Sequence, residues 1–145
     1  MDPELLRNER PLSRGTEPMA VRSATYMGAA RAAVGAALVI APTVALRLSR
    51  RDKPTGASVL LMRTIGIRDL VIGAGTMLAG RAGSERDARR WLRVGLSSDS
   101  LDAITGLLSG RAIGAAEAVG ASGAALAFVG LDLWALLSLP AVSPS

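Results

Sequence analysis

Hydrophobic residues gather in four long stretches of this 145-residue chain, and short charged segments separate them. The stretches cover about residues 24–46, 57–80, 91–109 and 112–139. Each is roughly 20–25 residues long, and a helix of that length crosses a hydrocarbon core of about 30 Å. The stretches are rich in Ala and Leu and lack period-two alternation, so they favour helices over strands. The pattern therefore predicts an all-α fold, an antiparallel bundle of four transmembrane helices.

The remaining segments suit this architecture. Residues 1–23 mix both signs of charge with several prolines, which predicts a flexible cytoplasmic tail, and residues 140–145 form a short C-terminal tail. Pro42 should end or kink the first helix near Ala41. A cleaved signal peptide is the alternative for this stretch, but the long tail before it and Arg31 within it argue against that.

Composition limits the chemistry. Half of the residues are hydrophobic, 16 are Gly, and Cys and His are both absent. Their absence removes disulfides, thiolate or imidazole metal ligands and catalytic triads with a histidine base, so we predict no cofactor or metal. The net charge is +5, but basic residues cluster at the ends of the apolar stretches, which indicates lipid headgroups as partners and not nucleic acid.

Ionisable residues inside the apolar stretches are the candidate functional residues. An ionisable side chain at mid-membrane costs about 2.5–3.5 kcal/mol on insertion scales, so it usually faces the bundle interior. Counted at about 1.5 Å per residue from each stretch's end, four of these residues lie about 9–13 Å deep and the other two about 18–20 Å. The six residues of this predicted layer are Arg31, Arg68, Asp69, Asp99, Asp102 and Asp132. Arg63 and Glu117, on the opposite side, are predicted to form a second pair.

Two arginines face four aspartates in this layer, so two carboxylates lack a cationic partner. They are then protonated, bound to a cation, reached by water or paired with a partner protein. The layer is interpreted first as a structural network that joins the helices, with a proton- or cation-handling site and a docking surface as alternatives.

Small residues share helix faces with these charges. Gly66 and Gly73 lie on the face of Asp69, while Gly95 and Gly106 lie on the face of Asp99. Small residues allow close helix contact in lipid, so the second and third stretches are expected to form the central antiparallel pair.

No catalytic motif emerges. Asp99 and Asp102 share a helix face and resemble the last fragment of the alcohol phosphotransferase signature, but its remaining elements are missing. No glycine-rich phosphate loop follows a strand, and the sequence contexts of intramembrane aspartyl proteases do not occur.

The segment RTIGIRDLVIGAG, residues 63–75, contains Gly66, Arg68, Asp69 and Gly73, and an Asp-bearing helix follows it. With these elements the chain resembles small uncharacterised four-helix bacterial membrane proteins, of the domain-of-unknown-function kind, over about residues 24–137. The resemblance implies a four-helix bundle and says nothing about a substrate.

The sequence thus predicts a multi-pass protein of the cell membrane, a non-catalytic component or accessory subunit of a membrane complex. Partners are the lipid bilayer and another membrane protein or a second copy of the chain. The alternative function is a small proton- or cation-coupled transporter that uses the Arg/Asp layer. The tail and second loop carry nine Lys and Arg residues, against five in the other loops, which predicts both termini in the cytoplasm. A re-entrant course remains an alternative for the second stretch.

Overall fold

The computed structural model describes residues 19–48 and 54–139, and within them all regular structure is helical. The elements are α1 (Met19–Ile40), α2 (Pro42–Leu48), α3 (Gly56–Arg81), α4 (Glu85–Leu108), α5 (Gly110–Ile113) and α6 (Ala115–Ser138). The all-α prediction is confirmed.

Local sequence signals explain where the helices begin and end. Pro42 separates α1 from α2 at Ala41, because its ring cannot continue the preceding helix. Thr55 caps α3 through a hydrogen bond from the Ser58 backbone N–H at 3.2 Å. Gly114 breaks the last stretch into α5 and α6, because its φ of 94° suits glycine alone.

Two helices begin earlier than hydropathy predicts. Residues 19–23, predicted as tail, form the first turn of α1, and α4 begins at Glu85 instead of near residue 91. Hydropathy marks only the apolar part of a helix, whereas Ser84 caps α4 and the arginines after it are good helix formers. The predicted tails at 1–18 and 140–145 lie outside the described residues.

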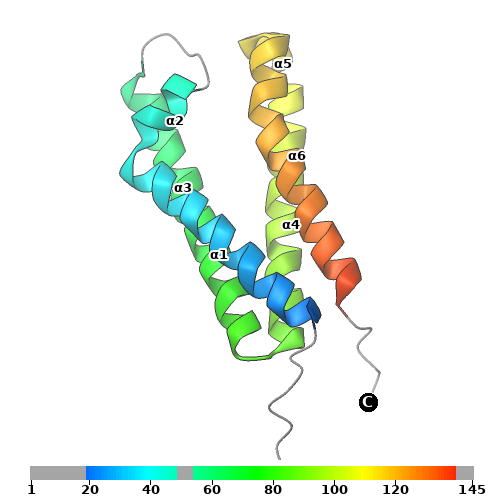
Figure 1. Ribbon diagram of the computed structural model, residues 1–145. Helices are drawn as coiled ribbons and strands as arrows, with labels where there is room; N and C mark the ends of the chain where they lie inside the picture. Colours follow the sequence, from blue (N-terminus) through cyan, green and yellow to red (C-terminus); the bar gives the residue numbers. More distant parts are fainter. Residues whose placement is uncertain (1–18, 49–53, 140–145) are drawn as a thin grey trace, which may run out of the picture.

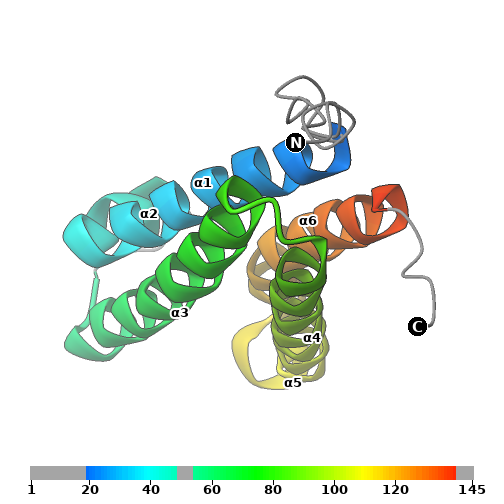
Figure 2. The same cartoon turned by 90° about the horizontal axis from the view of Figure 1, so that it is seen from below.

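The helices form two pairs. α1 packs mainly against α3, and α4 packs mainly against α6. Seen from the side, the pairs approach each other at the end where α3 turns into α4 and diverge toward α2 and α5 (Figure 1). The view from below shows the same division (Figure 2). The expectation that the second and third stretches form the central pair is therefore wrong.

Glycines explain why α3 packs on α1. A Cβ atom added at Gly28 or Gly35 of α1 would overlap the backbone of α3, and one at Gly73 of α3 would overlap the backbone of α1. Gly66 of α3 faces the carbonyl oxygen of Gly35 in the same way. The glycine face of α3 thus meets a complementary glycine face on α1 and not α4. Such seams let two helix backbones touch.

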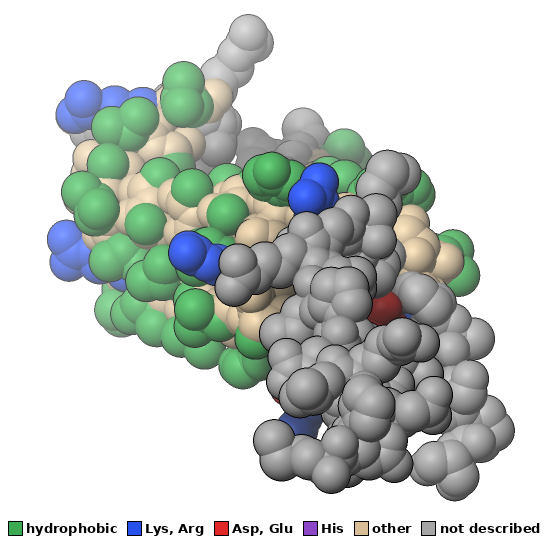
Figure 3. All heavy atoms as spheres, turned by 60° about the horizontal axis from the view of Figure 1, so that its bottom comes forward, with side chains coloured by type: hydrophobic (Ala, Val, Ile, Leu, Met, Phe, Trp, Pro, Cys, Tyr) green, Lys and Arg blue, Asp and Glu red, His purple; other side chains and the backbone are tan. Residues whose placement is uncertain are grey.

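The described interior consists mainly of small residues and includes several charged ones, while many large apolar side chains lie on the surface. Seven of the twelve buried hydrophobic residues in the described part of the chain are alanines, and Arg31, Asp69, Asp99 and Asp132 are buried with them. Twenty-two large hydrophobic residues are exposed there. Figure 3 shows many hydrophobic side chains on the described surface, with a few Lys and Arg side chains among them. Leu, Ile and Val are among the residue types most often buried in soluble proteins.

One described helix segment, Val21–Ile40, is long and apolar enough by itself to cross a membrane. Only 22% of its most apolar part is buried, so it is not the covered core helix of a soluble protein. Ser122–Ser138 is a shorter apolar segment. A single such helix near the N-terminus is weak evidence for a membrane protein, since a signal sequence has the same properties.

Candidate functional site: a buried arginine–aspartate cluster

Arg31 occupies the centre of the site. It projects from the middle of α1, and only 3% of the residue is exposed. Its Nη2 donates to Asp99 Oδ1 at 2.7 Å and to Asp69 Oδ1 at 3.2 Å, and its Nη1 donates to Asp132 Oδ2 at 2.9 Å. One guanidinium therefore contacts carboxylates from α3, α4 and α6. Arginine suits this position because its planar group presents several donors in fixed directions.

Arg68 extends the site toward the surface. Its Nη2 lies 3.1 Å from Asp69 Oδ1 and 3.8 Å from Asp99 Oδ1, and its Nη1 donates to Asp102 Oδ2. Asp69 is thus shared between both arginines. The side chains of Arg68 and Asp102 are 28% and 41% exposed, so this end of the site is more exposed than the Arg31 end.

All six residues of the predicted layer therefore meet in one network, which we call the charge cluster: Arg31, Arg68, Asp69, Asp99, Asp102 and Asp132. The helix pair α1–α3 supplies both arginines and one aspartate, and the pair α4–α6 supplies three aspartates. With every group ionised, the two halves carry +1 and −3 within the charge cluster. The opposite charges attract the two helix pairs to each other, and the whole carries an excess of two negative charges.

Small and aromatic residues shape the space around Arg31. A Cβ atom at Gly95 of α4 would lie 2.5 Å from Asp132 Oδ2 and 2.7 Å from Arg31 Nη1, so glycine makes room for this ion pair. The guanidinium carbon of Arg31 lies 4.9 Å from the centre of the Phe128 ring, within the range of a cation–π interaction. Neither role is predictable from the pattern of charges, since neither residue is charged.

A hollow of about 270 Å³ between α1 and α6 leads from the surface to the charge cluster. Its lining is apolar except at Arg31, Asp132 and the hydroxyl of Tyr26; Met27, Ala30, Phe128 and Leu131 complete the lining. Arg31 and Asp132 are the members of the charge cluster that line the hollow. A small group that entered it would therefore meet this ion pair first.

Two buried atoms of the charge cluster have no hydrogen-bond partner in the described structure. They are Nε of Arg31, a donor, and Oδ2 of Asp99, an acceptor. Buried polar atoms usually have a partner, so these two mark places for a water molecule or a proton. No group of three or more Asp and Glu side chains among the described residues is arranged to hold a metal ion.

The structure does not test the predicted second pair, Arg63 and Glu117. Arg63 is exposed on α3, and the side chain of Glu117 lies outside what the structure describes. The described parts of α3 and α6 do not pack against each other. The pairing of Arg63 with Glu117 therefore stays a prediction.

Comparison of the chain with protein-family models, with curated proteins and with solved structures finds no match.

Proposed function

We propose that this chain is a multi-pass membrane protein without catalytic activity, a component or accessory subunit of a membrane complex, with both termini in the cytoplasm. In this proposal the charge cluster holds the two helix pairs together inside the bilayer. The likeness to small four-helix bacterial membrane proteins of unknown function belongs to the same proposal.

The observation that carries the proposal is the placement of apolar side chains. Large residues such as Leu60, Leu101 and Leu137 are exposed, while Arg31 and three aspartates are buried. Large exposed apolar patches mark contact with a membrane or a partner. In lipid, ionisable residues face the bundle interior and pair there, as they do here.

The contacts of the charge cluster also favour a structural role. Each arginine contacts carboxylates of both helix pairs, so the network links α1–α3 with α4–α6. Close glycine contacts join α1 to α3. Between the pairs, the charge cluster adds buried ion pairs to the apolar packing of Ala24 and Ala79 against Ala88 of α4. Removing one member of a buried ion pair costs about 3–5 kcal/mol, enough to separate weakly packed helices.

Membrane integration can be tested directly because the chain has no cysteine. Native membranes are washed with alkaline carbonate, and single cysteines placed at Ala82 and Ser109 are labelled with an impermeant maleimide. Four spans put these two positions on opposite sides of the membrane, so only one reacts from each side. Release by carbonate, or labelling of both from one side, contradicts the proposal.

The role as an accessory subunit requires a partner. We would purify the tagged chain from its native membrane in a gentle detergent at native expression and measure the mass and composition of the complex. A stoichiometric second protein supports the proposal. An isolated monomer or homo-oligomer contradicts it and shifts attention to transport.

A second candidate is a small proton- or cation-coupled transporter. The excess of two carboxylates, the unpartnered Oδ2 of Asp99 and the hollow beside Asp132 favour it. Asp102→Asn separates the two functions. For a transporter it abolishes proton or cation flux into vesicles while the amount of folded protein stays the same. For a structural subunit the wild type gives no such flux, and the substitution only weakens folding or assembly, by about 1 kcal/mol or less.

A further inference from the structure

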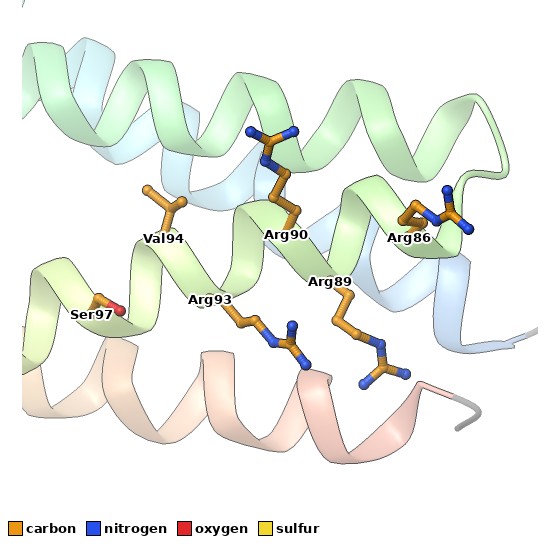
Figure 4. Close-up of a pocket in the computed structure, with 6 residues that line it drawn as sticks. All are labelled: Arg86, Arg89, Arg90, Arg93, Val94 and Ser97. Carbon is orange, nitrogen blue, oxygen red and sulfur yellow. The ribbon is translucent and has the colours of Figure 1, made fainter. Parts of the chain in front are cut away.

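Four arginines of α4 surround a hollow of about 720 Å³ on the surface of the bundle, near the end where α3 turns into α4. They are Arg86, Arg89, Arg90 and Arg93, and Val94 and Ser97 complete the described lining. We call this surface the arginine face. In Figure 4, Arg89 and Arg93 extend toward α6 and Arg90 extends toward α3. The guanidinium groups therefore spread around the hollow instead of pointing in one direction.

The arginine face is strongly positive. Among the described residues, no carboxylate lies within ion-pair distance of Arg86, Arg90 or Arg93. Asp87 lies on the same helix, but its carboxylate accepts a hydrogen bond from Ser84 Oγ at 2.7 Å. Arg89 is half-buried, and its Nη1 donates to the carbonyl oxygen of Leu136 on α6 at 3.5 Å. The charge complement of this surface is an anion with several oxygen acceptors.

The depth of the arginine face in a membrane follows from its distance to the charge cluster along α4. Arg93 and Arg86 precede Asp99 by six and thirteen residues on α4, which corresponds to about 9 and 20 Å along the helix. Half the thickness of a hydrocarbon core is about 15 Å. With the charge cluster near mid-membrane, the four arginines lie at the boundary between acyl chains and headgroups.

Exposed apolar residues follow the four arginines along α4, toward the C-terminal end of the helix. Val94 lines the hollow and is exposed, and Leu101 is exposed two turns further along α4. A ligand that fits both parts has an anionic head and an apolar tail. Arginine fits a phosphate better than lysine does, because its fork of donors binds two phosphate oxygens at once.

From these observations we infer that the arginine face binds the phosphate headgroup of an anionic phospholipid, with the acyl chains lying along Val94 and the adjacent apolar surface of α4. The inference rests on the proposed membrane location and adds a specific lipid class to it. Basic pockets between helices at a membrane surface bind anionic headgroups in this way.

The test uses the full chain in vesicles of equimolar phosphatidylglycerol and phosphatidylcholine. Protein is extracted with a neutral detergent, and mass spectrometry measures the ratio of the two lipids that remain bound. We expect phosphatidylglycerol to be enriched in the wild type. The R90Q/R93Q variant, which changes two exposed residues, should lower the enrichment at least fivefold, the effect of about one basic residue near an anionic surface.

The R47Q/R111Q variant is the matched control, because it removes the same charge from exposed sites on α2 and α5. Its enrichment of phosphatidylglycerol should stay within about twofold of the wild-type value. That change is smaller than the one expected from the loss of a single basic residue at an anionic surface. Equal enrichment in R90Q/R93Q and wild type overturns the inference, and so does displacement of the lipid by inorganic phosphate, which would indicate a site for a soluble anion.

A carbonate wash of the same vesicles separates the two proposals. Protein that resists carbonate but shows no lipid preference overturns the lipid site alone. Protein that carbonate releases overturns the membrane location and the lipid site together.

Discussion

Arg31 and Asp132 are 101 positions apart in the chain and are joined by a hydrogen-bonded ion pair of 2.9 Å. The contact links α1, the first described helix, to α6, the last. These two helices otherwise touch little: Arg31 also lies over the Phe128 ring, and Met27 packs against the buried cluster around Ala135. The strength of the ion pair can be measured because both members are buried and each has a neutral analogue.

Arg31→Gln should be the most destabilising change in the charge cluster. It removes the cation shared by three aspartates, and we expect a loss of about 3–5 kcal/mol in the free energy of unfolding. Unfolding by sodium dodecyl sulfate in mixed micelles provides the measurement. The double variant Arg31→Gln/Asp132→Asn should lose less stability than the sum of the losses in the two single variants, by about 0.5–3 kcal/mol. Strict additivity would show that the two side chains do not interact.

Asp99→Asn and Asp102→Asn should differ strongly in their effect on stability. Asp99 is closed in and lies 2.7 Å from Arg31, so its neutralisation breaks a buried pair and should cost about 3 kcal/mol. The side chain of Asp102 is 41% exposed, and its loss should cost about 1 kcal/mol or less. Thermal unfolding of both variants in the same detergent compares them. Equal losses of stability in the two variants would mean that solvent reaches Asp99 and Asp102 to the same extent.

Gly73→Ala tests the seam between α1 and α3. The added methyl group overlaps the α1 backbone, which cannot rotate away, so we expect a loss of about 1–3 kcal/mol. Gly130→Ala is the matched control, because nothing lies within 4 Å of its added methyl group. The control should be neutral or slightly stabilising, since alanine favours a helix over glycine by about 1 kcal/mol.

Gly95→Ala tests whether this glycine makes room for the ion pair. The methyl group displaces Arg31 or Asp132, and we expect a loss of about 1–3 kcal/mol, measured by the same unfolding titration. In an Arg31→Gln background the shorter side chain frees the space, so the second loss should be smaller. An undiminished loss in that background would place the effect of Gly95 elsewhere.

The sequence predicted the helical fold, the break at Pro42 and the six charged residues that the structure brings together. Charges in apolar stretches are visible without an alignment because lipid and protein interiors both penalise them. The pairing of helices was not predictable in the same way. Helices α1 and α3 are both rich in Ala and Gly, and α4 carries Gly95 and Gly106 on one face, so small residues alone do not show which faces meet. Counting residues gives the level of a side chain along its helix but not the neighbour toward which it points.

The division of charge between the two helix pairs has a consequence for biosynthesis. The ribosome releases α1 and α3 before α4 and α6, so both arginines reach the membrane when only one of their four acidic partners has been made. On the proposed membrane location, the first pair cannot enter the lipid alone without exposing a cation. It has to wait beside the insertion machinery until the acidic pair emerges, and both pairs then leave together. A chain truncated after α3 should consequently remain bound to that machinery or be degraded.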